Sequence, residues 1–277
     1  MELDEIWYKR DNLNKLATNI FSNYIMPIYL ADYRQVPIQF GSAFLLNSKN
    51  KNYLITAAHS LIPEKGSEYE RHVPCILVGK EKKPFFIKDF AYSLPENEEL
   101  NKYDIAAARL DDRIISQILL SNDAHINVVS SDKVMPGLPR EKNLFCFLGY
   151  QNSKNKSLPS GEFKAPKSTA YLNGSPNKEL YESAKISPQN HLLVDFPTES
   201  DREGRMPGIP NGLSGGPVFS FGAKDSWENV EYGLAGVATG YLPVQNILKA
   251  TDIGMVNVLI SKYDDVAHKG KHGIMLE

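Results

Sequence analysis

Short apolar or alternating runs, separated by turn residues, dominate the chain from about residue 25 onward. Runs of this kind are typical of strands, and the frequent Gly and Pro between them indicate tight connections. The pattern predicts an all-β barrel or sandwich. The runs cover residues 26–30, 40–46, 53–57, 75–78, 85–87 and 105–110, and then 144–148, 168–172, 191–196, 217–221 and 232–239.

Three other segments have the pattern of helices. Apolar positions recur at roughly helical spacing over residues 1–24, which predicts an amphipathic helix packed ahead of the main domain. Residues 112–120 are expected to form a helix between two halves of the chain, and residues 256–263 a short closing helix. The polar stretches 151–168 and 197–212 are rich in Pro, Gly and Ser and are predicted to be loops.

The composition is that of an ordinary globular protein. The chain has 277 residues, of which 42% are hydrophobic and 23% charged. A chain of this length and hydrophobic content can bury a large core, in one domain or two packed halves, without disulfides or metals. The formal net charge of -2 predicts no attraction to nucleic acid or to an acidic membrane. No stretch has the length of a membrane span.

The two cysteines, Cys75 and Cys146, each lie within an apolar run. We expect both to be buried reduced thiols in strands. Charges interrupt the N-terminus every few residues, so it has no apolar signal-peptide core. Both features favour a cytoplasmic location. His268 and His272 lie four residues apart, but further ligands at suitable spacing are missing, so we expect no metal and no cofactor.

Residues 212–217 read Gly-Leu-Ser-Gly-Gly-Pro and are the most specific chemical signal in the chain. A serine hydroxyl is a weak nucleophile unless its surroundings activate it. Glycines beside Ser214 permit a tight turn that exposes the hydroxyl. Backbone N–H groups of such a turn can stabilise an oxyanion. An ordinary Gly-rich hairpin turn is the structural alternative.

Two further motifs contain a base and a carboxylate. Residues 54–60 read Leu-Ile-Thr-Ala-Ala-His-Ser, so an apolar strand delivers His59 at its end, next to small residues. Histidine is the usual general base because its pKa lies near neutral pH. Asp104 opens the apolar run 105–110, where burial requires a partner such as a histidine N–H. Taken singly, a structural histidine and a turn aspartate are the better interpretations.

Taken together, the motifs around His59, Asp104 and Ser214 resemble those of the trypsin-like serine peptidase family. The order is the family's order, and the two gaps are 45 and 110 residues. Residues 41–45 and 235–240 also resemble the family's early strand and the strand lining its substrate cleft.

The resemblance implies an all-β fold of two six-stranded antiparallel β-barrels, the chymotrypsin-like fold, with an N-terminal helix and a short C-terminal helix. We expect an N-terminal helical extension, a barrel carrying His59 and Asp104, a second barrel carrying Ser214, and a flexible tail. These cover residues 1–24, 25–125, 126–265 and 266–277.

The implied activity is hydrolysis of peptide bonds in a protein or peptide substrate. His59 would act as general base for Ser214, with Asp104 orienting it. Gly212 and Ser214 would provide the oxyanion hole through their N–H groups. Further substrate-binding residues implied by the resemblance are Gly208, Asn211, Thr239, Gly240 and Tyr241.

Two departures from the secreted members point to a bacterial intracellular type. Leu213 stands where digestive enzymes carry the aspartate that pairs with a new N-terminus, so no zymogen activation is expected. Ser60 follows His59 where secreted members have a cysteine. Gly208 replaces the acidic pocket residue of trypsin, which leaves no reason to expect cleavage after Lys or Arg. We expect activity to be gated by a regulatory partner protein, an oligomer or the 197–212 loop.

Two alternatives remain at this point. One is a catalytically inactive trypsin-like module used for protein binding, against which the intact His59, Asp104 and Ser214 argue. The other is a serine esterase or related acyl hydrolase. Such enzymes usually place the serine in a strand-to-helix elbow, whereas residues 218–221 after Ser214 have a strand pattern.

Overall fold

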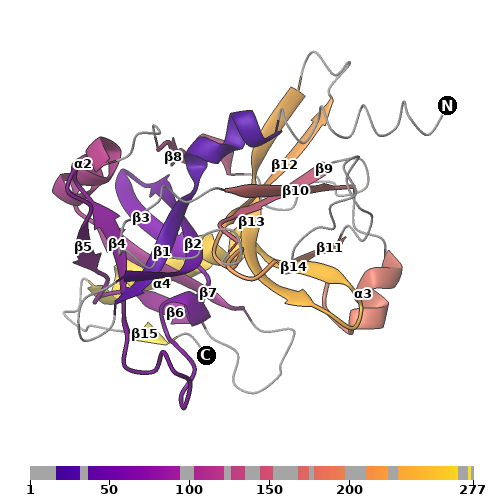
Figure 1. The fold of residues 1–277 in the computed structure, drawn as a ribbon. Helices are drawn as coiled ribbons and strands as arrows, with labels where there is room; N and C mark the ends of the chain where they lie inside the picture. Colours follow the sequence, from indigo (N-terminus) through magenta and orange to yellow (C-terminus); the bar gives the residue numbers. More distant parts are fainter. Residues whose placement is uncertain are drawn as a thin grey trace, which may run out of the picture.

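The alternating pattern folds into two β-sheets that lie side by side in a computed structural model (Figure 1). The structure describes residues 17–31, 37–93, 103–121, 126–134, 144–151, 168–174, 178–196, 210–223, 230–267 and 274–275. The prediction of an all-β, chymotrypsin-like fold is confirmed for this part of the chain.

The N-terminal sheet has the strand order β15-β6-β7-β3-β2-β1-β4-β5, with β8 also pairing with β2. Its described part has nine strands rather than the expected six, because the two-residue segments β8 and β15 add parallel partners and β6 adds a short antiparallel one. The strands are β1 (Met26–Ala31), β2 (Pro37–Ser48), β3 (Lys51–Thr56), β4 (Val73–Val78), β5 (Lys83–Phe86), β6 (Ala91–Ser93), β7 (Ile105–Leu110), β8 (Val128–Val129) and β15 (Ile274–Met275).

The C-terminal sheet is antiparallel and six-stranded within the described residues, in the order β10-β9-β12-β13-β14-β11. This matches the six strands expected for this half. The strands are β9 (Leu144–Gly149), β10 (Thr169–Asn173), β11 (His191–Asp195), β12 (Pro217–Ala223), β13 (Val230–Leu242) and β14 (Ile247–Asp252).

Helices occupy the edges and the back of the two sheets. The predicted connector is confirmed as α2 (Asp112–Ser121), and the closing helix is the longer α4 (Ile253–Ala267). The sequence pattern missed α3 (Lys178–Ala184). Single 3₁₀ turns are η1 (Ser22–Tyr24), η2 (Ala58–Ser60) and η3 (Ser131–Lys133). Among the described residues, none of the helices has the length and apolar character that a membrane span requires.

The predicted N-terminal helix is described only at its end, where residues 17–21 are helical; residues 1–16 lie outside the described part. Phe21 is 2% exposed, and its ring stacks on Phe219 of β12 with the ring centroids 4.4 Å apart. This end of the helix therefore packs on the C-terminal sheet, a location that the sequence pattern did not specify.

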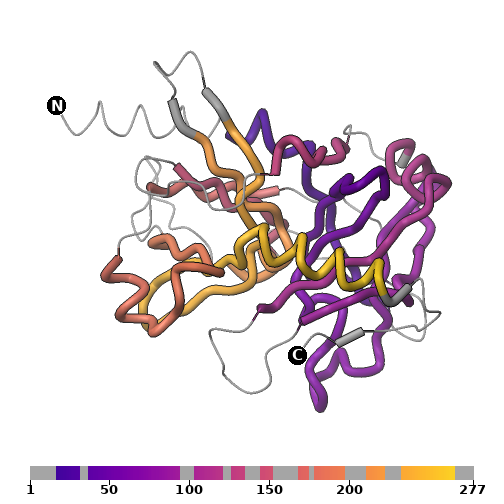
Figure 2. The backbone as a smooth tube through the Cα atoms, turned by 180° about the vertical axis from the view of Figure 1, so that it is seen from behind, coloured from indigo at the N-terminus to yellow at the C-terminus, as the bar shows by residue number. Residues whose placement is uncertain are grey.

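One hydrophobic core joins the two sheets. Its buried members come from both sheets and from α4, and they include Phe44, Ile55, Phe219, Val237, Val256 and Leu259. Figure 2 shows α4 crossing behind both halves. Asp264 of α4 accepts hydrogen bonds from Lys51 and Tyr53 of β3, each at 2.8 Å. The C-terminal helix therefore joins the N-terminal sheet to the C-terminal one.

Candidate active site

His59 and Asp104 are brought together by strand pairing. His59 lies in η2, directly after β3, and Asp104 lies directly before β7. Strands β3 and β7 are antiparallel partners, with Thr56 opposite Ala106, so the end of one strand meets the beginning of the other. Ala57 and Ala58 are fully buried. Their small side chains let the chain turn into η2 and present the imidazole at the sheet edge.

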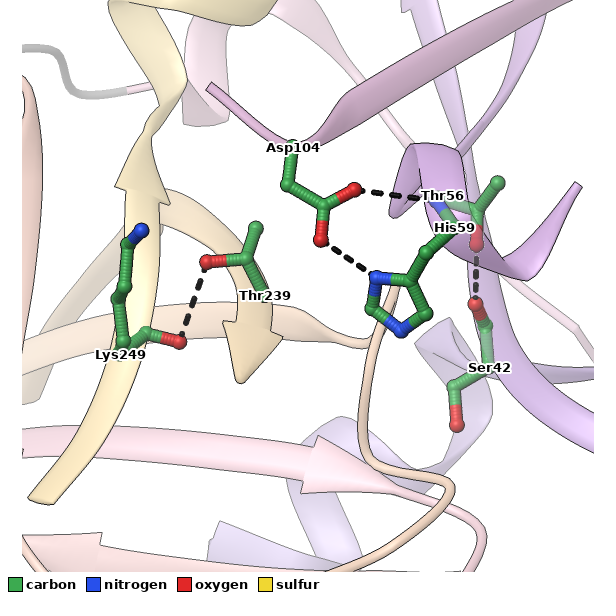
Figure 3. Close-up of polar contacts among 6 residues, drawn as sticks. All are labelled: Ser42, Thr56, His59, Asp104, Thr239 and Lys249. Atoms are coloured by element: carbon green, nitrogen blue, oxygen red, sulfur yellow. Dashed lines mark hydrogen bonds and ion pairs between the residues drawn. The ribbon is translucent and has the colours of Figure 1, made fainter. Parts of the chain in front are cut away.

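The Asp104 carboxylate holds His59 at two points (Figure 3). Its Oδ2 lies 2.5 Å from the ring Nδ1, and its Oδ1 accepts a hydrogen bond of 3.1 Å from the His59 backbone N–H. The Asp104 side chain is 11% exposed and that of His59 is 40% exposed. This geometry fixes the ring orientation and the tautomer with the proton on Nδ1, which leaves Nε2 as the basic nitrogen.

Opposing effects act on the pKa of His59. Burial of the ring lowers it, while the charge of Asp104 and the hydrogen bond to it together raise it by more, so the pKa lies above the ordinary 6.5. A folded pKa above the unfolded value means that the pair stabilises the fold fully below about pH 6.5. That contribution is lost as the pH rises through the folded pKa. Because its pKa is raised, the His59 ring is a stronger base than a free histidine.

Ser214 stands on a turn that only glycine can build. Gly212 has a φ of 93° and Gly215 a φ of 87°, both in the left-handed region. A Cβ on Gly215 would lie 2.0 Å from the Ser42 carbonyl oxygen. Backbone hydrogen bonds fasten the turn, from Gly215 to Ala238 O at 2.7 Å and from Ser42 to Ser214 O at 2.9 Å. Ser214 is half-buried while its neighbours on both sides are buried.

The N–H groups of this turn divide into two sets. Those of Leu213, Gly215 and Gly216 donate to carbonyl oxygens within the fold. Those of Gly212 and Ser214 have no acceptor among the described residues. The Ser42 hydroxyl donates to the Gly212 carbonyl oxygen at 2.7 Å, which fixes the peptide between Gly212 and Leu213. These two N–H groups can therefore donate hydrogen bonds to an anionic oxygen.

A cavity of about 670 Å³ is lined both by His59 and by the turn that carries Ser214. Both His59 and Ser214 line it, as do Asn211, Gly240 and Tyr241 from the sequence-based prediction. The predicted residue Thr239 is not among the lining residues: it is 7% exposed, and its hydroxyl donates to the Lys249 carbonyl oxygen at 3.5 Å. Gly208 lies outside the described residues.

Sequence patterns did not single out the apolar wall of this cavity. It consists of Phe40, Phe147, Pro243 and Leu248, which come from strands far apart along the chain and from a turn. As single apolar residues they look like any other core position. No charged side chain other than His59, if protonated, is among the residues that line the cavity.

Ser214 and His59 share the cavity without a direct hydrogen bond. Among the contacts of the described residues, none joins the Ser214 hydroxyl to the His59 ring. In enzymes without substrate such contacts are often long and tighten only in the reacting complex.

The cysteines are not alternative nucleophiles. Cys75 and Cys146 are both free and buried, as expected. Burial raises the pKa of the Cys75 thiol to about 12 and raises that of Cys146 further. Neither thiol ionises near neutral pH, so neither supplies a thiolate.

A Gly215→Ala substitution is expected to destabilise the protein by about 2–5 kcal/mol, from backbone strain and overpacking together. The midpoint of urea unfolding measures this. Gly240→Ala is the matched control, because nothing lies within 4 Å of its added Cβ and its φ is not in the left-handed region. The control should change stability by less than about 1 kcal/mol. Equal midpoints for the two variants would contradict the geometry of the turn.

Comparison with known proteins gives low similarity. No family model matches the chain, and no curated protein matches it. Among solved structures, one described as "Structure of Glu endopeptidase in complex with MPD" is 12% identical, with a TM-score of 0.46, covering 85% of this chain and 89% of that chain. Another, on "the coupled folding and binding of the intrinsically disordered Sesbania mosaic virus VPg protein", is 13% identical, with a TM-score of 0.44, covering 84% and 87%. Such distant likeness carries no information on activity.

Proposed function

We propose that this protein is a serine endopeptidase whose catalytic triad is His59, Asp104 and Ser214. The observation that carries the proposal is the two-point contact of Asp104 with His59, beside a cavity that His59 and Ser214 both line. A buried carboxylate that orients a histidine ring in this way is the arrangement that activates a nearby serine hydroxyl.

In the proposed reaction His59 Nε2 takes the proton from Ser214 as Oγ attacks the carbonyl carbon of the peptide bond. Asp104 stabilises the imidazolium that forms. The carbonyl oxygen becomes an anion and accepts hydrogen bonds from the N–H groups of Gly212 and Ser214. The imidazolium then protonates the leaving amine, and water, deprotonated by the same histidine, hydrolyses the acyl-enzyme.

The free edge of β13 supports an extended substrate. Strand β12 pairs with β13 only as far as Val237, whereas β13 continues to Leu242 with β14 on its other side. Beyond Ala238, no described strand covers the edge that faces the cavity. A substrate segment can add there as a further strand through backbone hydrogen bonds. Asn211, Gly240 and Tyr241 line the cavity beside this edge.

The esterase alternative is disfavoured by the strand that comes after Ser214. The turn leads into β12 (Pro217–Ala223), not into a helix, so it lacks the strand-to-helix elbow of that class. A catalytically inactive binding module is the second candidate. The observation in its favour is that no hydrogen bond joins Ser214 to His59 among the described residues.

The same proposal includes gating of the activity and action in the bacterial cytoplasm. Leu213 is 3% exposed and packs in the core of the C-terminal sheet, so it has no charge to pair with a new N-terminus. Activation by cleavage of a zymogen therefore lacks the acidic side chain that it needs at this position. In its place, a regulatory partner protein or an oligomer controls the activity. The two buried thiols suit a reducing compartment.

Labelling with a fluorophosphonate probe tests the proposal without a known substrate. We expect the probe to phosphonylate Ser214 with release of fluoride, and Ser214→Ala to abolish labelling. Ser220→Ala is the matched control, because the Ser220 hydroxyl is buried with no hydrogen-bond partner among the described residues. It should label like the wild type. Failure to label in the purified chain and in cell extract would favour the binding module, and full activity on casein without any partner would refute gating.

A further inference from the structure

The described side chains that line the active-site cavity, apart from His59, are uncharged and mostly apolar. Phe147 and Leu248 belong to the core of the C-terminal sheet, and Tyr241 packs against that core. Lys249 follows Leu248 but does not line the cavity, because successive side chains of a strand point to opposite faces of the sheet. A charged substrate side chain placed against these walls would therefore lose water without gaining a partner of opposite charge.

A β-bulge turns Tyr241 toward the cavity. The pairing of β13 with β14 shifts between Ala238 and Gly240, which leaves Thr239 as an extra residue in β13. Beyond the shift, Tyr241 lies directly opposite Leu248. Residues directly opposite each other share one face of a sheet, and both of these line the cavity. Without the extra residue, strict alternation from Ala238 would point Tyr241 to the other face.

Asn246 fastens the Tyr241 ring in this position. The Tyr241 hydroxyl donates a hydrogen bond of 2.8 Å to Asn246 Oδ1, and the ring lies against that of Phe196 with the centroids 5.0 Å apart. Asn246 is itself bound to Phe196 twice. Its Nδ2 donates to the Phe196 carbonyl oxygen at 2.7 Å, and its own carbonyl oxygen accepts from the Phe196 N–H at 2.8 Å. Both ends of the asparagine amide are therefore used, one of them on a ring that lines the cavity.

The backbone of Asn246 also favours this residue type. Its φ is 57°, in the left-handed region, which asparagine adopts more readily than most residues. Asn246 directly precedes β14, so it ends the turn that joins β13 to β14. One side chain thus connects this turn, the end of β11 beside Phe196, and the wall of the cavity.

We propose that the cavity binds an apolar side chain of the substrate, with Tyr241 as a specificity-determining wall and Asn246 as the positioning residue that holds it. The side chain belongs to the substrate residue whose carbonyl Ser214 attacks. The inference rests on the proposed function, because it names the substrate class of the same site. Ser214 and Tyr241 line one cavity, so a substrate whose carbonyl lies at Ser214 has these walls within reach of its own side chain.

Peptide binding to Ser214→Ala tests the inference, because this variant cannot hydrolyse the ligand. Capped peptides of the form acetyl-Ala-Ala-X-amide, with X as Phe, Leu, Ala, Glu or Lys, are titrated by calorimetry. We expect the Phe and Leu peptides to bind about ten- to a hundredfold more tightly than the Ala peptide. The Glu and Lys peptides should bind no more tightly than the Ala peptide. Equal binding of all five peptides, or tightest binding of the Glu or the Lys peptide, would overturn the inference.

Asn246→Gly tests the positioning residue, because glycine keeps the left-handed turn and removes both side-chain hydrogen bonds. We expect the preference for Phe over Ala to fall by about three- to tenfold, and peptide hydrolysis to show this mainly as a higher KM. Asn50→Gly is the matched control, since Asn50 has a φ of 59° and is exposed in the turn between β2 and β3. It should leave the preference unchanged.

A purely structural role of Asn246 would lower stability but leave the ratio of the two dissociation constants as in the parent protein. That result in folded Asn246→Gly would overturn its role as a positioning residue. If Asn246→Gly does not fold, Tyr241→Phe decides, because it removes only the hydroxyl that Asn246 accepts from. It should also weaken the preference for Phe over Ala, and an unaltered preference would contradict the proposal.

The binding measurement needs no catalysis, so it separates this inference from the proposed function. If the wild type neither labels nor cleaves but Ser214→Ala prefers the Phe and Leu peptides, the apolar pocket stands and the protease proposal fails. If the wild type labels at Ser214 but cleaves a mixed peptide library after Glu or Lys, the protease proposal stands and the apolar pocket fails.

Discussion

Replacing Ser214 with alanine is expected to lower peptide hydrolysis about a millionfold, because the variant has no nucleophile to form the acyl-enzyme. Ser214 is half-buried and lines the same cavity as His59. The measurement is turnover of the best peptide found by profiling a mixed peptide library by mass spectrometry. Residual cleavage within tenfold of the wild type would show that another group attacks the substrate.

Non-additivity provides a sharper version of the same test. His59→Ala alone should also cost about a millionfold, and the double variant with Ser214→Ala should be no slower than either single variant. The reason is that base and nucleophile act in one step, so removing either abolishes it. Losses that multiply would mean that the two residues act independently, against the triad.

The second large effect concerns Asp104. Asp104→Asn should slow fluorophosphonate labelling about ten-thousandfold. The asparagine amide has an N–H₂ group to donate toward Nδ1, which would place the ring proton on Nε2 and remove the base. The pH profile should move as well. Without the charge and hydrogen bond of Asp104, only burial acts on His59, and burial lowers its pKa, so the acid limb should shift to lower pH.

Asp195→Asn is the control for this substitution. Asp195 ends β11 and is exposed, so the same chemical change there alters no buried contact. Its labelling rate and pH profile should match those of the wild type. If Asp104→Asn also retained the wild-type rate, the two-point contact with His59 would serve the fold alone.

Much of the fold could be predicted because strand formation depends on local patterns. The run 105–110 coincides with β7, and the runs 26–30 and 217–221 fall within β1 and β12. The run 53–57 extends one residue past the end of β3. Strand β14 was missed for a physical reason. Its residues Ile-Leu-Lys-Ala-Thr-Asp contain three polar side chains without strict alternation, yet all six residues are buried. Burial on both faces comes from neighbouring strands and helices, which a local pattern does not contain.

The same distinction between local and long-range information applies to the candidate site. The sequence by itself determined which residue types could do the chemistry and where the chain needs glycine. The left-handed φ of Gly212 and Gly215 and the small residues before His59 are local requirements, so a local pattern contains them. Only the tertiary structure decided that β3 and β7 bring Asp104 onto His59, that Ser214 lines the same cavity, and that Lys249 is buried within β14. These depend on distances between segments far apart along the chain, which are set by how the two sheets pack.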